Sequence, residues 1–265
     1  MTTSWLPKEQ CETNDITIFL LRLHALADGV DLHVSDLGDL AGNPLILLEP
    51  QQHNVGPSVL IAAGFHGDEP GGCWGLLRFL EDGLRDFVKS ANISFLPLVN
   101  PTGFRKDRRT NDWNEDPNRG FCHSSSSQAQ PSREGALLVD HLSRLKPLAA
   151  DGFLSLHEDL EFDRFYIYTF GTNSDPGPFS EALRSEESKV FEAYPDGPLE
   201  GSVVRNGIIH NFHDGSFEDR LFHEGVKNTA CTETPGPSDI SIRVEVNARL
   251  SYAFVRYAVD SNSRP

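Results

Sequence analysis

The sequence predicts an α/β fold, a three-layer α/β/α sandwich in which helices cover both faces of a mixed, mainly parallel sheet. Short apolar runs bounded by Gly, Pro or Asn alternate along the chain with runs whose apolar residues recur at helical spacing. Strands that are buried on both faces give continuous apolar runs of this kind, and their alternation with helices is typical of a parallel sheet. The runs expected to form strands are 45–49, 58–63, 93–99, 153–156, 203–209 and 226–232.

Four segments have the spacing of helices. Residues 18–26 predict an amphipathic helix, and apolar residues also recur at helical spacing over 73–87. Ser132 is placed to cap a helix that Pro147 would stop. The pattern over 246–258 is the clearest, because its apolar residues follow i, i+4, i+7, i+8, i+11 and i+12 and so form one stripe for packing onto a sheet.

Length and composition favour one globular domain over residues 1–265. No Pro/Gly/Ser linker separates halves of different composition, there is no internal repeat, and the serine run at 124–127 is expected to be a surface loop. A chain with 38% hydrophobic and 23% charged residues is ordinary for a soluble protein. We therefore expect a single catalytic domain, with the motifs described below spread over about 40–260.

Charge and terminal sequence exclude several classes of partner. The net charge of −16 argues against nucleic acid, which is bound through basic patches. No apolar stretch approaches the ~20 residues of a membrane span, and the amino terminus lacks a basic start followed by an apolar core, so we expect a cytoplasmic protein. No C-x-x-C pair occurs, and in this compartment we expect four free thiols, at Cys11, Cys73, Cys122 and Cys231.

Polar residues follow several of the predicted strands. His66 and Glu69 come just after one apolar run, Asn100 after the next, and His157 and Glu233 close two later runs. Because ligands collect at the carboxyl ends of parallel strands, residues far apart in sequence are expected to converge on one rim of the sheet. Two histidines, one acid as a ligand and a second acid as a base form the set that a metallohydrolase needs.

Each of these residues also has a purely structural interpretation. His66 would be a turn histidine bonded to a nearby carboxylate, and His157 would be satisfied by Glu158 or Asp159. Those two acids would alternatively fix the tautomer of a metal-binding imidazole. Glu233 would be a surface acid before a Pro-Gly turn. The four residues together favour the metal site over these separate interpretations.

Six motifs occur in an order that resembles the zinc metallocarboxypeptidases. This carboxypeptidase A-like superfamily also contains the murein-peptide amidase and the aspartoacylase and succinylglutamate desuccinylase branches. The resemblance covers roughly residues 40–260. The motifs are FHGDE (65–69), NPTGF (100–104), RRTN (108–111), DPNRGF (116–121), FLSLHED (153–159) and TETPG (232–236).

The resemblance implies one zinc ion per chain. His66, Glu69 and His157 would hold it, with water in the open fourth position. Glu233 would be the general base, and Arg109, or its neighbouring arginine in the RRTN motif, would polarise the scissile carbonyl. A His-Glu-His ligand set favours zinc among the divalent ions.

The resemblance also implies residues that bind the substrate. Asn118 and Arg119 match the pair that grips a terminal carboxylate. The peptidases place a tyrosine a few residues before a Gly-Ser turn, and here His210 stands in that position. Phe217 and Glu218 then fall where the side chain of the substrate is recognised, and Glu218 would favour an amine-bearing side chain.

These features predict a zinc-dependent metallocarboxypeptidase that hydrolyses the amide bond beside the free carboxyl terminus of a small peptide. One alternative is a deacylase for N-acyl amino acids, which needs the same machinery. Another is an inactive binding protein with the same fold, whose usual sign is the loss of a ligand or of the base; neither is lost here. The remaining site-proximal histidines are expected to be structural or at the surface: His123, His141, His213 and His223.

Overall fold

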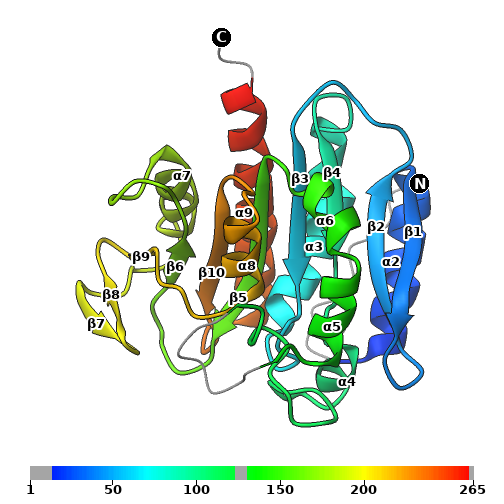
Figure 1. Cartoon of the computed structure of the whole chain (residues 1–265), viewed down its shortest axis with the longest axis horizontal. Helices are drawn as coiled ribbons and strands as arrows, with labels where there is room; N and C mark the ends of the chain where they lie inside the picture. The colour runs from blue at the N-terminus through cyan, green and yellow to red at the C-terminus, as the bar shows by residue number, and fades with distance from the viewer. Residues whose placement is uncertain (1–13, 123–129, 263–265) are drawn as a thin grey trace.

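An eight-stranded mixed sheet forms the centre of the computed structural model, which describes residues 14–122 and 130–262 (Figure 1). The strand order is β1-β2-β4-β3-β5-β10-β6-β9. Its strands are β1 (Leu32–Asp39), β2 (Pro44–Pro50), β3 (Ser58–Ala63), β4 (Asn92–Leu96), β5 (Gly152–Asp159), β6 (Tyr166–Thr169), β9 (Ile208–His210) and β10 (Thr229–Pro235). Two short strands, β7 (Gly197–Leu199) and β8 (Ser202–Val204), form a separate hairpin.

The middle of the sheet is parallel and its margins are mixed. β3 pairs in parallel with β4 and β5, and β5 pairs in parallel with β10. β1 pairs antiparallel with β2, β2 with β4 and β6 with β10, while β9 runs parallel to β6. The expected mixed, mainly parallel sheet is therefore confirmed.

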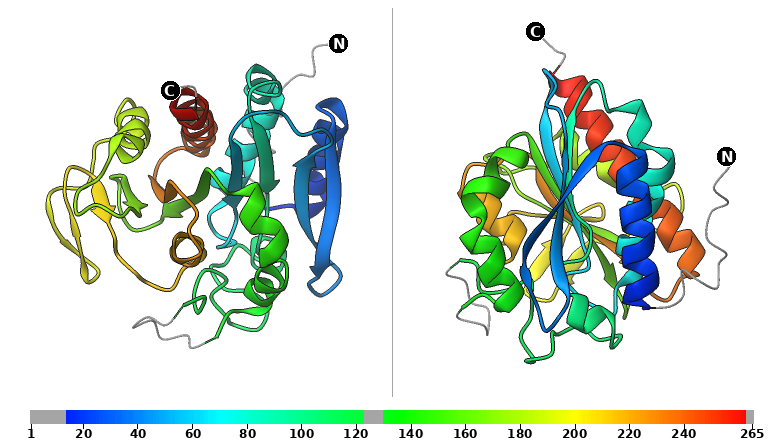
Figure 2. Two further views of the ribbon diagram at one scale, coloured as in Figure 1. Left: turned by 45° about the horizontal axis from the view of Figure 1, so that its top comes forward. Right: turned by 90° about the vertical axis from the view of Figure 1, so that its right-hand side faces the viewer.

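Helices cover both faces of this sheet, as the right-hand view of Figure 2 shows. On one face lie α2 (Ile16–Gly29), α3 (Pro70–Asp82), α7 (Pro178–Glu187) and α9 (Ile240–Asn262); on the other lie α5 (Arg133–Asp140), α6 (Leu142–Leu148) and α8 (Phe217–His223). The short α4 (Pro101–Phe104) and the 3-10 helix η1 (Leu84–Asp86) lie in connections. None of the helices in the described ranges is long and apolar enough to cross a membrane.

Strand β3 shows why the apolar runs are continuous. Val59, Ile61 and Ala63 pack under α2, α3 and α9, whereas Leu60 and Ala62 pack with α5, α6 and α8 on the other face. Successive side chains of a strand point to opposite faces, so a strand covered on both sides needs apolar residues at every position. The predicted bounds of this strand are those of the structure.

Several sequence predictions need correction, among them run 93–99, which ends as a strand at Leu96. Run 203–209 is not one strand, because Asn206 and Gly207 both have positive φ, 53° and 73°, and turn the chain between β8 and β9. Run 226–232 is shifted to β10, and 153–156 extends to the end of β5. Ser132 does cap α5, accepting a hydrogen bond from the Gly135 amide at 3.0 Å.

The single helix predicted between Ser132 and Pro147 breaks at His141 into α5 and α6. Pro147 lies inside the last turn of α6 instead of ending it. β1, β6, α7 and α8 were not expected. Cys73, Cys122 and Cys231 are free thiols, as predicted. Cys11, His123 and the serine run at 124–127 lie outside the described residues.

Candidate metal centre and active site

The turn after β3 carries His66 to the carboxyl edge of the sheet. Gly64 has φ +68°, and a Cβ on it would lie 2.6 Å from the Cys73 sulfur, so the strand can end here only with glycine. Gly67 is equally constrained, because a Cβ would lie 2.0 Å from the carbonyl carbon of Gly103. The turn is thereby pressed against α4, and His66 points inward with 3% of its surface exposed.

Glu69 is the residue before α3, which begins with Pro70. Proline is favoured at this position because the first amide of a helix has no intrahelical partner. The carboxylate of Glu69 makes no capping bond to the helix and is instead turned toward His66 and His157. His157 reaches the same point from β5, where its ring stacks on Phe65 at 5.7 Å and is 1% exposed.

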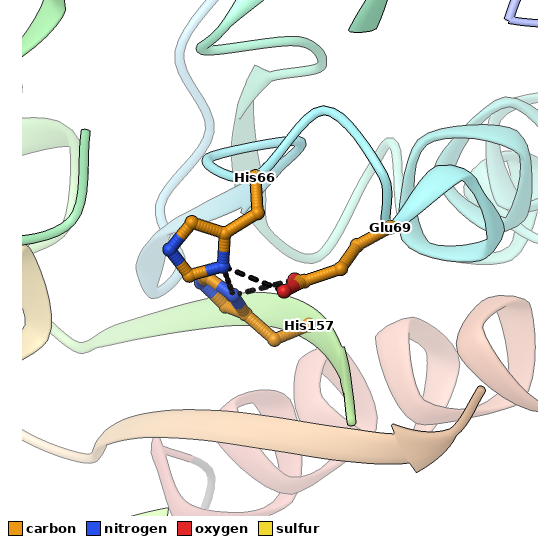
Figure 3. Close-up of side chains that lie close together, drawn as sticks. All are labelled: His66, Glu69 and His157. Atoms are coloured by element: carbon orange, nitrogen blue, oxygen red, sulfur yellow. Dashed lines mark hydrogen bonds and ion pairs between the residues drawn. The ribbon is translucent and has the colours of Figure 1, made fainter. Parts of the chain in front are cut away.

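Figure 3 shows these three side chains converging. Nδ1 of His66 lies 2.6 Å from Glu69 Oε1, and Nδ1 of His157 lies 2.8 Å from Glu69 Oε2. The two Nδ1 atoms are 3.2 Å apart. Zinc bonds of ~2.0–2.1 Å in a tetrahedron separate ligand atoms by about 3.3 Å. The donor set therefore fits a tetrahedral metal ion: the separation of the two Nδ1 atoms is close to this value, and the two contacts with the carboxylate are shorter.

The ionisation state of the Glu69 carboxylate agrees with a metal-binding role. Burial alone would raise the pKa of Glu69, but the adjacent imidazoles of His66 and His157 more than offset it and hold the pKa well below its usual range. Glu69 is thus ionised, as a metal ligand must be.

Asp116 was missed by the sequence analysis as a site residue. Its Oδ1 lies 3.2 Å from Nε2 of His66, the ring nitrogen that faces away from Glu69. Burial opposes ionisation, yet the hydrogen bond with His66 and the charges of His66 and Arg109 keep the pKa of Asp116 well below its ordinary value. A carboxylate in this position fixes the orientation and tautomer of a metal-binding imidazole. Its place in the DPNRGF motif, two residues before Asn118, was the available signal.

Glu233 lies beside the three converging residues but on the neighbouring strand. It is the register partner of His157 across β5 and β10, and its Oε1 is 3.7 Å from the sulfur of Cys231. Burial raises the pKa of Glu233 to about 8; Glu69 adds to the rise, and His157 opposes it. A carboxyl group whose pKa lies near the operating pH can both take up and release a proton there.

The structure distinguishes between the two adjacent arginines. Nη1 of Arg109 lies 3.7 Å from Glu69 Oε1, and its Nη2 lies 3.1 Å from Asp116. Arg108 is turned away, toward Asp112 and the backbone of its own loop. Arg109 is therefore the arginine at the site.

Asn118 and Arg119 lie next to the cluster, and the amide nitrogen of Asn118 is 3.3 Å from Nε2 of His157. The amide nitrogen of Asn118 donates to Glu218 at 3.2 Å, and its Oδ1 accepts from the Phe217 amide at 2.9 Å. Arg119 donates to the Asn118 carbonyl at 2.8 Å and pairs with Asp214 at 3.2 Å. Both residues line the same cavity as His66, Glu69 and His157.

This cavity has a volume of about 250 Å³ and contains the predicted metal ligands, base and clamp residues together. Its arginines are Arg109 and Arg119, and its aromatic walls are Tyr166, Tyr168 and Phe170. The sequence analysis did not anticipate these tyrosines, which come from the unexpected strand β6. Carboxyl groups dominate the lining: Asp68, Glu69, Glu158, Asp159, Glu161, Glu200, Asp214, Glu218 and Glu233.

Two predicted substrate-binding residues lie elsewhere. His210 is not among the residues that line this cavity; its Nδ1 is 3.0 Å from the Thr169 hydroxyl and its Nε2 is 3.2 Å from the Asn173 carbonyl. Phe217 is fully buried and packs against the rings of Phe153 and Phe121 in the core. Glu218, by contrast, lies in the cavity wall as expected.

Comparison with known proteins shows extensive similarity. Residues 55–163 match the model of the succinylglutamate desuccinylase/aspartoacylase catalytic domain. A provisionally named metallopeptidase of Shewanella amazonensis SB2B is 38% identical, with a TM-score of 0.88 over 92% of this chain and 94% of that one. Another from Shewanella denitrificans OS217 is 36% identical, with a TM-score of 0.87 over 93% and 91%.

The fold is also shared with more distant structures. Bovine thrombin-activatable fibrinolysis inhibitor, solved in complex with tick carboxypeptidase inhibitor, is 16% identical, with a TM-score of 0.66 over 96% of this chain and 99% of that one. No curated protein sequence matches the chain. The shared fold, the matched catalytic-domain model and the near-complete alignment with the Shewanella proteins establish that the chain belongs to the zinc carboxypeptidase-like superfamily of hydrolases.

Proposed function

We propose that the protein is a zinc-dependent carboxypeptidase that hydrolyses the amide bond beside the free carboxyl terminus of a peptide. The observation that carries the proposal is that one cavity holds the His66–Glu69–His157 cluster, the base candidate Glu233 and the cationic side chain of Arg119. The cluster would hold zinc through two imidazole nitrogens and one carboxylate. When bound there, zinc supplies Lewis acidity, which lowers the pKa of water and polarises a carbonyl.

The remaining steps belong to side chains of the chain itself. Glu233 accepts the proton of the attacking water and later delivers it to the leaving amine, a task suited to its raised pKa of about 8. Arg109, held beside Glu69 by Asp116, stabilises the negative charge that develops on the carbonyl oxygen.

Arg119 and Asn118 are the proposed clamp for the terminal carboxylate. A guanidinium presents two parallel N–H donors to a carboxylate, and in this acidic cavity it provides a rare cationic group. The backbone carbonyl of Asn118 and the carboxylate of Asp214 hold the Arg119 side chain in place, so little ordering is needed when substrate binds.

Arg119→Lys is expected to lower kcat/KM for peptides with a free carboxyl terminus by about ten- to hundredfold. Charged hydrogen bonds contribute ~1.5–3 kcal/mol, and lysine cannot make the two parallel contacts. The measurement is steady-state hydrolysis of one peptide in free and C-terminally amidated form. Arg256→Lys, at an exposed position of α9, is the matched control. Equal cleavage of free and amidated peptides by the parent would rule out an exopeptidase.

A deacylase for N-acyl amino acids is the second candidate, favoured by the match to the succinylglutamate desuccinylase/aspartoacylase catalytic domain. Its substrate also carries a carboxylate beside the scissile amide, so the same clamp and base would serve. Side-by-side assays on a peptide panel and on N-acyl amino acids separate the two. Higher kcat/KM on the acyl amino acids would replace the first proposal with the second.

The acidic lining predicts a preference for a substrate with an amine-bearing side chain. Glu218 is buried in the cavity wall, where a substrate ammonium group would gain a charged partner. Glu218→Gln is expected to reduce the ratio of kcat/KM for lysine-ended over leucine-ended peptides by about tenfold. Glu200→Gln, an exposed acid lining the same cavity, is the control. A parent enzyme that favours acidic or apolar terminal residues would contradict this prediction.

A further inference from the structure

A second group of metal-ligating side chains lies outside the active-site cavity, on α8 and the segment before it. Nδ1 of His213 is 2.6 Å from Asp219 Oδ1, and Nε2 of His223 is 3.2 Å from the same oxygen. The ligand atoms of the three residues all lie within 4.8 Å of one another. From this geometry we infer a second metal site, in which His213, Asp219 and His223 bind a divalent transition metal of the zinc class.

The donor types select the class of ion. Two imidazoles and one carboxylate suit Zn²⁺, Co²⁺, Ni²⁺ or Cu²⁺, whereas Mg²⁺ and Ca²⁺ prefer oxygen ligands alone. The site is separate from the catalytic cluster, because none of its three ligands lines the active-site cavity.

The ligands are held in place before any ion binds. Asp219 is 1% exposed, and its Oδ2 accepts a hydrogen bond from the Gly215 amide at 3.0 Å, which leaves Oδ1 to the imidazoles. His223 follows Asp219 by four residues on α8 and therefore lies on the same face of the helix. The ring of His213 stacks on Phe222 at 5.9 Å. Such fixed ligands lower the entropic cost of binding.

Access to the site is open on the solvent side. The side chains of His213 and His223 are 42% and 53% exposed, so an ion can enter and complete its coordination with water. Each imidazole can also move its proton to its other ring nitrogen and present the facing nitrogen to the ion.

The position of the site connects it to the substrate cavity. The segment between His213 and Asp219 carries Asp214 and Ser216, which line that cavity, and Asp214 is the ion-pair partner of Arg119. An ion bound to residues at both ends of the segment would tie it to α8. The second site would therefore stabilise the wall that holds the proposed carboxylate clamp.

Zinc content measured on the full chain tests this site independently of activity. Metal-free protein is equilibrated with Zn²⁺ buffered at about 1 µM free ion, a level that fills sites of submicromolar Kd. We expect two equivalents in the parent and one in His213→Gln/His223→Gln, with unchanged circular dichroism. The single variant His223→Gln serves if the double variant does not fold. His24→Gln/His53→Gln, at two exposed histidines outside the site, should retain both equivalents.

The catalytic-cluster variant Glu69→Gln distinguishes the two sites. It should retain the second equivalent and give visible Co²⁺ bands that disappear when His213 and His223 are also replaced. The proposal is overturned if His213→Gln/His223→Gln binds as many equivalents as the parent, whether that number is one or two. Failure of the proposed peptidase activity leaves this measurement unaffected, because only bound metal is counted.

Discussion

Glu233→Gln is expected to lower kcat at least ~10²-fold while KM and metal content change little. The amide keeps the shape of the side chain but cannot accept the proton of the attacking water. Glu233 lies beside His157 on the next strand and is not one of the three residues whose donor atoms converge at Glu69. The expected result is therefore loss of proton transfer with the metal site intact.

The measurement combines steady-state kinetics with zinc analysis of the same preparation. Glu200→Gln is the matched control, because Glu200 is an exposed carboxylate in the lining of the same cavity. A Glu233→Gln protein that keeps most of its activity, or that loses its zinc, would show that the base has been misassigned. Absence of activity in the metal-loaded parent would favour an inactive binding protein.

Glu69→Gln is expected to lose the catalytic metal, and with it the activity. Each oxygen of Glu69 contacts one imidazole, so the substitution removes a negative charge and turns an NH₂ group toward His66 or His157. Even replacing residues that only support metal ligands costs 10–100-fold in affinity, so for this ligand we expect a loss of at least ~100-fold.

Zinc affinity is measured by competition with a chromophoric chelator. Glu161→Gln provides the control, since Glu161 is an exposed acid that lines the same cavity without contacting the cluster. If Glu69→Gln binds zinc at the catalytic site as tightly as the parent, the ligand set is wrong. If it loses activity but keeps that zinc, Glu69 has a catalytic role instead of a binding role.

The parts of the fold predicted well are those with strong local patterns. β3 was predicted to the residue because both of its faces are buried. The existence of α9 was predicted because its apolar stripe is long, although the helix begins before and ends after the predicted run of 246–258. β10 was misplaced because Val226, which is buried before the strand begins, was counted into it, whereas the buried Thr234 was left out. Threonine fits a buried strand sterically, but its hydroxyl hides the strand from a hydrophobicity pattern.

The site residues also divide into those that local sequence patterns predict and those whose position depends on long-range packing. His66, Glu69, His157 and Glu233 stand at strand ends or within motifs, and the structure brings them together. Side-chain direction in the irregular segment before α8 cannot be derived from spacing, because it depends on long-range packing. Alignment on the Gly-Ser turn therefore placed His210 at the substrate, whereas its ring is bonded to Thr169 and Asn173 outside the cavity.

In the proposed mechanism, the register of β5 and β10 separates the residues of catalysis from those of substrate choice. His157 and Glu233 are opposite one another in a parallel ladder, so their spacing is set by backbone hydrogen bonds and by the ~4.8 Å distance between neighbouring strands. The clamp and the aromatic walls come instead from a loop and from marginal strands. The scaffold can therefore exchange its specificity segments, in natural divergence or in the laboratory, without resetting the distance over which the proton moves.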